Sequence, residues 1–330
     1  MHAILTGATG LLGRHLTAAL LDRQWTVTAI VRKNSDRRPI QLPGVAFHVC
    51  DLAREPLDPA VVRTADVVFH AAAAVTDWAP WSDYVANTIE ATRRVTAAML
   101  AAGCRRLVHI STVGVYGRPR VIQPLTEDQP YSSIGRWDYY SNSKIAAERI
   151  VWEQQRHQRL TVTVFRPAMI YGPSAHGLIA RVAGYLRRGH AALVGDPTVN
   201  LPLIHVRDVA AAVVLAANHP AAAGEAFNLV NPEPVTQSDF FNTVAILSDT
   251  PPVVKQIPYR VAYAAGFLAE ISAHLTRSTT PPCISRYRVS LFGHPRDYAI
   301  SKAQTVLHWQ PQIAFNDGIR QTIASLNSTV

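Results

Sequence analysis

Short apolar segments alternate with longer amphipathic segments through the first half of the chain. The apolar segments are typical of buried strands, and the segments between them carry the three-to-four-residue period of helices. This pattern predicts strands at Ala3–Thr6, Thr26–Val31, Val45–Cys50, Asp66–His70, Arg106–Ser111 and Thr161–Arg166, and helices at Leu11–Asp22, Trp81–Gly103 and Tyr139–His157. Such alternation favours a parallel sheet that is covered on both faces.

The second half of the chain has more prolines, shorter elements and less regular alternation. Ile257–Leu275 reads as an amphipathic helix. The residues expected on its apolar face are Val261, Ala265, Leu268 and Ile271. We interpret this half as a smaller lobe beside the sheet.

A glycine-rich turn connects the first predicted strand to the first predicted helix. Gly7, Gly10 and Gly13 have the spacing of a tight turn, a close backbone approach and a helix–strand contact. The N–H groups at the start of the helix then face a pyrophosphate. The turn residues expected at a dinucleotide are Gly7, Thr9, Gly10, Leu11, Leu12 and Gly13.

Together, the turn and the alternation predict an α/β fold: a Rossmann-type doubly wound parallel sheet with a smaller C-terminal substrate lobe. Residues 1–166 form the dinucleotide-binding domain. Residues 167–330 form mainly the substrate-binding lobe, with some segments returning to the sheet.

The end of the second strand indicates which nicotinamide cofactor is used. An acid there would favour NAD, but the chain has Arg32 and Lys33, with no acid until Asp36. A guanidinium suits a 2′-phosphate, so NADP is predicted in preference to NAD. Asp51 and Leu52 would border the adenine. Close backbone approach to the cofactor is expected at Ala71, Ala72 and Ala73.

Tyr140 and Lys144 lie one turn apart on the same face of a predicted helix. A lysine ammonium at that distance favours the phenolate and would lower the tyrosine pKa, so the tyrosine can serve in acid–base catalysis. Ser111 and Thr112 end the fifth strand, and either hydroxyl could stabilise a developing alkoxide. The pattern indicates nicotinamide-dependent redox chemistry.

Net charge and cysteine usage indicate which binding partners and which cellular compartment to expect. The chain has 32 Lys and Arg against 23 Asp and Glu, but the basic residues are dispersed and form no nucleic-acid-reading motif. A basic pocket for a phosphorylated cofactor or an acidic substrate fits better. The three cysteines have no metal-binding or disulfide spacing, which favours a reducing compartment. No apolar run reaches the roughly 18 residues of a membrane span, and the N-terminus reads as a strand, so a cytoplasmic location is expected.

Several motifs together resemble the extended short-chain dehydrogenase/reductase family. They are the glycine turn 6–13, His70–Ala73, Ile110–Gly117, Tyr140–Lys144, Arg166–Pro173, Ile204–Ala210, Ser301–Ala303 and Leu307–Pro311. The resemblance implies that Tyr140 and Lys144 are the catalytic pair. Thr112 stands where the family's catalytic Ser or Thr is usual, with Ser111 as the alternative. The resemblance also places four residues at the nicotinamide: Pro167, Ala168, Met169 and Ile170.

Departures from the family patterns refine the expected activity. Val113-Gly114 replace the Asp-Glu of nucleotide-sugar dehydratases, which argues against dehydration. The usual Asn-x-x-Gly-Thr appears as Asn87–Thr92, one residue longer and without the glycine. Ala168–Ile170 lack the Asn that nucleotide-sugar enzymes often carry before Tyr-Gly-Pro.

Val75–Trp81 and the helix from Ile257 are similar to the 3β-hydroxysteroid dehydrogenase and dihydroflavonol reductase-like branch. That branch acts on apolar ketones and alcohols. Trp78 and Trp81 either stack on a flat substrate or pack within the protein. The resemblance implies an NADP-dependent ketone reductase or secondary-alcohol dehydrogenase that acts as a homodimer. A nucleotide-sugar epimerase that retains NAD is the alternative, and a nicotinamide-sensing regulatory protein is disfavoured by the Tyr/Lys pair.

Overall fold

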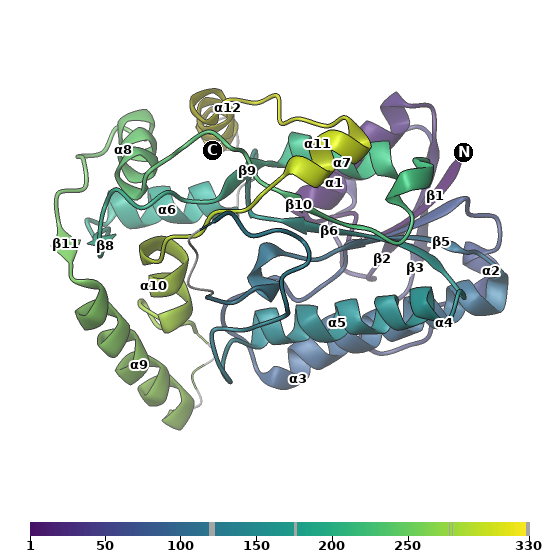
Figure 1. Cartoon of the computed structure of the whole chain (residues 1–330), viewed down its shortest axis with the longest axis horizontal. Helices are drawn as coiled ribbons and strands as arrows, with labels where there is room; N and C mark the ends of the chain where they lie inside the picture. Colours follow the sequence, from purple (N-terminus) through teal and green to yellow (C-terminus); the bar gives the residue numbers. More distant parts are fainter. Residues whose placement is uncertain (119–122, 175–176, 277, 279, 328–330) are drawn as a thin grey trace.

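The centre of the molecule is a parallel sheet (Figure 1). The computed structural model describes residues 1–118, 123–174, 177–276, 278 and 280–327, and within them the sheet has seven strands. Their order is β10-β6-β5-β4-β1-β2-β3, comprising Ala226–Leu229, Thr161–Pro167, Arg106–Ile110, Val67–His70, His2–Thr6, Thr26–Val31 and Val45–Val49. The order reverses between β1 and β4, which is where such sheets bind ligands. The doubly wound α/β fold is therefore confirmed.

Helices cover both faces of the sheet (Figure 1). One face carries α1 (Leu11–Asp22), α7 (Val206–Ala216) and α11 (Ser301–Leu307), and the other carries α2 (Pro59–Val62), α4 (Ala91–Ala102) and α5 (Tyr139–Arg156). Neighbouring strand residues point to opposite faces. Leu5 packs with Leu16 of α1, whereas Ile4 packs with Met99 of α4. Both faces of β1 are buried, as its continuous apolar run predicts.

The remaining elements build a lobe beside one end of the sheet (Figure 1). They are β7 (Met169–Tyr171), α6 (Leu178–Arg187), β8 (Leu193–Val194), β9 (Leu203–His205), α8 (Gln237–Leu247), β11 (Gln256–Ile257), α9 (Tyr259–Leu275), α10 (Arg286–Gly293) and α12 (Phe315–Asn327). A separate apolar cluster that includes Tyr171, Phe240 and Ile319 holds much of this lobe together. Between β9 and α8, the chain returns to the sheet as α7 and β10.

The helix expected over Trp81–Gly103 is divided into three parts. Trp81–Tyr84 forms α3, Val85–Glu90 forms a π-helix, and α4 follows. A π-turn accommodates one residue more than an α-turn. The extra residue in the segment Asn87–Thr92 is therefore absorbed within the helix instead of being looped out.

The predicted inner face of α9 is wrong. Val261 and Leu268 are exposed, at 57% and 66%, while Ala262, Gly266 and Ala273 are buried. A Cβ on Gly266 would lie 3.0 Å from the backbone N of Arg286, so α9 approaches the start of α10 too closely for a larger side chain. The helix thus packs through its small residues. Among the described residues, no helix has the length and hydropathy needed to cross a bilayer.

Candidate active site

The glycine turn is packed against itself and against the end of β4. Gly7 has φ +71°, and a Cβ there would lie 2.8 Å from the backbone C of Ala71 and N of Ala72. A Cβ on Gly13 would lie 2.1 Å from the carbonyl oxygen of Gly7. Both positions therefore require glycine, because a side chain at either would collide with the protein backbone.

The start of α1 fits a pyrophosphate group. Gly10 is the N-cap residue and supplies no side-chain acceptor to the first turn. The N–H groups near Leu11 and Leu12 are therefore suited to receive an anion. Thr9 lies in the same turn, where its carbonyl accepts a hydrogen bond of 2.8 Å from Arg14 Nε. The residues present fit the dinucleotide that the sequence predicts.

Arg32 lies at the end of β2, close to two polar side chains. Its Nη2 donates to Asn87 Oδ1 at 2.7 Å, and its Nε is 3.7 Å from Asp51 Oδ1. The Arg32 side chain is 62% exposed. The π-helix thus brings Asn87 to the strand end that the sequence assigns to the adenosine ribose. Lys33 and Leu52 follow β2 and β3 at the same edge of the sheet.

The alanines and the residues that the sequence predicts at the cofactor follow two strands of the sheet, β4 and β6. Ala71, Ala72 and Ala73 leave β4 beside the glycine turn, and Ala72 N donates to Thr6 Oγ1 at 3.2 Å. Pro167 ends β6. The next three residues are Ala168, which is buried, and Met169 and Ile170, which are partly buried on β7.

The start of α5 holds Tyr140 and Lys144. Asp138 is the N-cap, and its Oδ1 accepts a hydrogen bond of 3.2 Å from Ser141 N. Lys144 is 3% exposed, and its Nζ donates to the Ile110 carbonyl at 2.8 Å. The Thr112 side chain lies close enough to that of Tyr140 to act on its pKa. The fold therefore brings the end of β5 to the Tyr/Lys face of α5.

The pKa values of the pair are set mainly by burial. Burial raises the pKa of Tyr140 to about 12, and the Thr112 side chain acts in the opposite direction. Burial lowers the pKa of Lys144 to about 8, whereas the Glu148 carboxylate acts to raise it. The sequence predicts a tyrosine pKa lowered by Lys144, but burial has the larger effect here. Tyr140 is thus protonated at neutral pH and suited to donate a proton.

Ser111 has a different partner from Thr112. Its hydroxyl is buried and donates to Glu148 Oε1. The second Glu148 oxygen lies 2.7 Å from Arg166 Nη2, and both charged side chains are buried. Arg166 also donates to Tyr116 Oη at 2.8 Å. The Ser111 hydroxyl is therefore part of a buried ion-pair network, which leaves Thr112 as the hydroxyl beside Tyr140.

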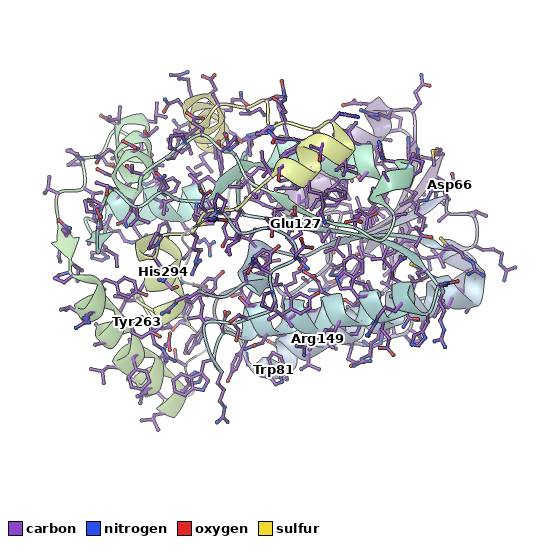
Figure 2. The ribbon with its side chains drawn as sticks, viewed as in Figure 1. Asp66, Trp81, Glu127, Arg149, Tyr263 and His294 are labelled. Carbon is purple, nitrogen blue, oxygen red and sulfur yellow. The ribbon has the colours of Figure 1, made fainter. Side chains whose placement is uncertain are left out.

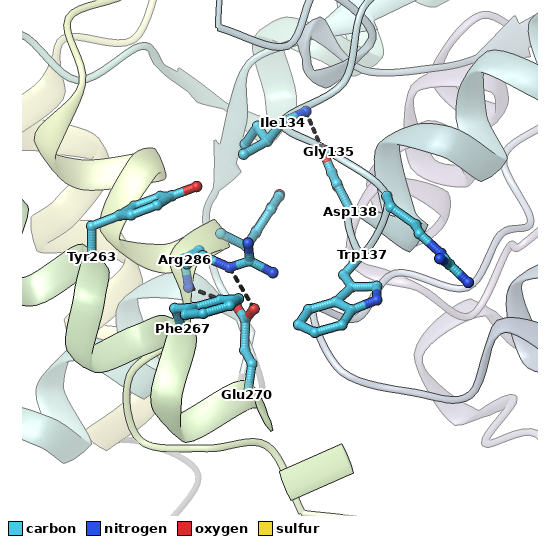
Figure 3. Close-up of a pocket in the computed structure, with 10 residues that line it drawn as sticks. Ile134, Gly135, Trp137, Asp138, Tyr263, Phe267, Glu270 and Arg286 are labelled. Atoms are coloured by element: carbon cyan, nitrogen blue, oxygen red, sulfur yellow. Dashed lines mark hydrogen bonds and ion pairs between the residues drawn. The ribbon is translucent and has the colours of Figure 1, made fainter. Parts of the chain in front are cut away.

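A cavity of about 380 Å³ lies between the start of α5 and the lobe (Figure 3). Its lining residues are Ile134, Gly135, Arg136, Trp137, Asp138, Tyr263, Phe267, Glu270, Arg286 and Tyr287. Two of them connect it to Tyr140, one of the two residues that the sequence predicts to be catalytic. Asp138 caps the helix of Tyr140, and Tyr287 is close enough to Tyr140 for an electrostatic interaction that helps to raise the pKa of Tyr287.

Four of the ten lining residues are aromatic, and the Arg286–Glu270 ion pair among them has no net charge. Arg286 Nε donates to Glu270 Oε2 at 2.7 Å. The Arg286 guanidinium lies 4.9 Å from the Trp137 ring centroid and 4.8 Å from that of Phe267 (Figure 3). Such a wall favours an apolar, flat substrate.

The two tryptophans of the Val75–Trp81 segment pack on protein groups. Trp78 Nε1 donates to the Ser278 carbonyl at 3.0 Å, and its ring centroid is 4.9 Å from that of His274. Trp81 packs on Tyr139 and lies below the sheet in the orientation of Figure 2. Neither is among the described residues that line the cavity.

Sequence reasoning missed the lobe side of the site. Phe267, Arg286 and Tyr287 lie more than a hundred residues from Tyr140, and no motif connects them to it. Their only sequence signal is the aromatic and arginine content of the segments around α9 and α10. Asp77 adds a further connection between these parts of the chain, because its carboxylate pairs with Arg288 of α10.

Comparisons with known proteins identify the family and the fold. Residues 3–229 match the NAD dependent epimerase/dehydratase family. The 2-alkyl-3-oxoalkanoate reductase of Stenotrophomonas maltophilia is 29% identical over 98% of this chain and 99% of its own length. The decarboxylating sterol-4-alpha-carboxylate 3-dehydrogenase of Mus musculus is 27% identical over 97% of this chain and 90% of its own. The UDP-glucose 4-epimerase of Thermotoga maritima shares the fold, with a TM-score of 0.79 at 19% identity over 100% of this chain and 99% of its own.

Proposed function

The chain belongs to the NAD dependent epimerase/dehydratase family, and we propose that it is an NADP-dependent ketone reductase or secondary-alcohol dehydrogenase with an apolar substrate. The observation that carries this proposal is the aromatic cavity beside Tyr140, bordered by Asp138 and Tyr287. Two relatives are named as an oxoalkanoate reductase and a sterol carboxylate dehydrogenase, so their substrates carry a carboxylate near the reacting carbon. We extend this feature to the substrate of the present chain. The proposed substrate is therefore an apolar 3-oxo or 3-hydroxy acid.

The proposed chemistry assigns one task to each catalytic side chain. When bound, the nicotinamide supplies the hydride for carbonyl reduction or accepts it in alcohol oxidation. In the direction of reduction, Tyr140 donates its proton to the carbonyl oxygen. Thr112 hydrogen-bonds the same oxygen as charge develops on it. Lys144, held at the Ile110 carbonyl, positions the ribose and supplies positive charge near the phenol.

NADP is the proposed cofactor because Arg32 lies at the end of β2. Its guanidinium is well exposed and is oriented by Asn87 and Asp51. An exposed guanidinium can form paired hydrogen bonds with a 2′-phosphate. The glycine turn would contact the pyrophosphate, which NAD and NADP have in common. The proposed preference for NADP over NAD therefore rests on Arg32 and Lys33.

The test is absorbance at 340 nm with NADPH and then NADH against apolar 3-oxo acids and ketones. Consumption of NADPH with an oxo compound is the expected result. Replacement of Tyr140 by Phe should reduce kcat by orders of magnitude, and a change of less than tenfold would reject its role. UDP- and dTDP-sugars serve as controls. If sugars interconvert with no net absorbance change and oxo compounds do not react, the protein is an epimerase instead.

A homodimer is also part of the proposal, through α5 and the helical segment Trp81–Ala102. Arg149 of α5 (Figure 2) is exposed, and Leu100 of α4 is 38% exposed. Size-exclusion chromatography with light scattering measures the mass directly. A mass of one chain at assay concentration would contradict this part of the proposal without affecting the chemistry.

A further inference from the structure

Two arginines converge on one buried hydroxyl in the lobe. Arg118 Nε donates to Ser290 Oγ at 2.6 Å, and Arg296 Nη2 donates to the same oxygen at 2.7 Å. Ser290 lies on α10 and has no exposed surface. Two guanidinium groups are thus held at one hydroxyl oxygen, where their like charges repel.

Neither arginine has an ion-pair partner among the described residues. Arg296 is 9% exposed, and its Nε is buried without a hydrogen-bond partner, as is Nη2 of Arg118. The Asp138 carboxylate interacts with Arg296 only at longer range and is already bonded to Ser141 N and Ile134 N. Buried charges are costly unless they are paired. This cluster therefore has the charge and the free donors to hold an anion.

The cluster adjoins two residues that line the cavity, and one of them connects it to Tyr140. The Arg118 guanidinium lies 4.7 Å from the ring centroid of Tyr263, which lines the cavity. Tyr287, another lining residue, interacts electrostatically with both Arg296 and Tyr140. Figure 2 shows Tyr263 on α9 and His294 beside α10 at this end of the lobe. Both arginines act on His294 and lower its pKa, although its burial has the larger effect.

The Arg286–Glu270 ion pair within the cavity is less suited to bind an anion than Arg118 and Arg296. Arg286 is already bonded to Glu270 through its side chain and its backbone N. An incoming carboxylate there would meet the Glu270 charge. Arg118 and Arg296 have no such competitor, and two guanidinium groups can donate to both oxygens of one carboxylate.

We propose that Arg118 and Arg296 form the subsite for the substrate carboxylate, which selects 3-oxo or 3-hydroxy acids over neutral ketones and alcohols. The subsite rests on the proposed function, since it orients the acid so that its reacting carbon lies at Tyr140. Ser290 keeps the two guanidinium groups together. An acid that neutralises part of their charge binds more tightly than its ester.

The test compares a 2-alkyl-3-hydroxy acid with its methyl ester in oxidation by NADP⁺, using the full chain. Because 3-oxo acids lose carbon dioxide readily, the hydroxy acid gives the cleaner assay. Arg118→Gln should lower kcat/KM for the acid about 10- to 100-fold and leave the ester within twofold. Arg296→Gln should do the same if circular dichroism shows that it folds. The control is Arg260→Gln, which removes an exposed charge from α9.

An acid-to-ester ratio of kcat/KM that is equal in wild type, Arg118→Gln and Arg260→Gln would overturn the subsite while leaving the reductase proposal intact. Thermal shift separates the two further, because it needs no turnover. Stabilisation by the hydroxy acid that is lost in Arg118→Gln supports the subsite even if no oxidation occurs. Arginine-dependent stabilisation by UDP, with none by the acid, would show that the pair binds a diphosphate and would reject the carboxylate.

Discussion

His70 and His109 are register partners on β4 and β5, with ring centroids 5.4 Å apart, but they differ in hydrogen bonding. His70 Nδ1 is 2.7 Å from Thr6 Oγ1, and its Nε2 is 3.0 Å from Thr92 Oγ1. Both ring nitrogens of His109 are buried without a partner among the described residues. Burial lowers the pKa of both rings, that of His70 to about 3.

Replacement of His109 by Leu should therefore raise the free energy of unfolding, by about 1 kcal/mol, because it removes buried polar atoms that have no partner. Replacement of His70 by Leu should lower it by about 1–3 kcal/mol, since the Thr6 and Thr92 hydroxyls each lose one of their hydrogen bonds. Urea denaturation at pH 7 measures both. Equal destabilisation by the two changes would show that His109 has an unrecognised partner.

The same two rings predict how stability depends on acid. The unfolded chain binds protons at these histidines near pH 6.5, whereas the folded chain resists protonation until much lower pH. Their contribution to stability is therefore complete above about pH 6.5 and is lost as the pH falls toward 3. Removal of His109 should make the free energy of unfolding fall less steeply over this range. An unchanged slope in denaturation between pH 4 and 6.5 would contradict the lowered pKa.

Loss of the Thr112 hydroxyl should mainly affect catalysis, whereas loss of the neighbouring Ser111 hydroxyl should mainly affect stability. Thr112→Val is expected to lower kcat by about 10²- to 10³-fold, because one donor to the developing alkoxide is lost. Ser111→Ala should change kcat by less than tenfold but lower the melting temperature, since buried Glu148 loses a hydrogen bond. Steady-state kinetics and thermal melts on both variants provide the measurement. The assignment is reversed if Ser111→Ala proves to be the catalytically damaging change.

Lys144 should set an alkaline limit on carbonyl reduction. Its pKa is lowered to about 8, so the free enzyme loses the ammonium charge above that pH instead of near 10.5. Tyr140 keeps its proton over the same range, because its pKa is about 12. The value of kcat/KM should then fall as the pH rises through about 8. Lys144→Arg keeps the charge, so any activity that this variant retains should not fall as the pH rises through about 8. If the fall persists in the variant, it is caused by the titration of another group.

Arg32 should control the choice between the two nicotinamide cofactors. Arg32→Ala is expected to lower kcat/KM for NADPH at least tenfold and to leave the value for NADH within twofold, since only the 2′-phosphate contact is lost. Arg54→Ala is the matched control, because Arg54 also lies near Asp51 and is exposed. Equal kcat/KM with NADPH and NADH in the wild type would contradict the predicted preference.

Local patterns were sufficient to predict much of the sheet and the helix that carries Tyr140 and Lys144. The predicted bounds of Thr26–Val31 and Leu11–Asp22 agree with β2 and α1, because a buried strand and an amphipathic helix each have a clear period. The inner face of α9 could not be predicted in this way. Its orientation depends on the close approach of Gly266 to α10, and large apolar side chains remain on the opposite side.

Contacts between distant segments were also beyond sequence reasoning. Arg118, Ser290 and Arg296 come together only because the lobe folds back on the end of β5. The additional residue near Asn87 was visible in the sequence, but a loop or a π-turn could accommodate it equally well. Only packing against α5 and the contact with Arg32 distinguish these outcomes.

The position of β10 bears on how the chain folds during its synthesis. This strand pairs with β6, but nearly sixty residues of lobe and connecting helix separate the two along the chain. Until Ala226–Leu229 leave the ribosome, β6 remains an open edge, and Tyr116 lacks Asn228, the acceptor for its hydroxyl. The nucleotide-binding sheet therefore cannot be completed until much of the lobe has been synthesised. A fragment that ends at Arg166 would lack β10, and we expect it to aggregate rather than fold independently.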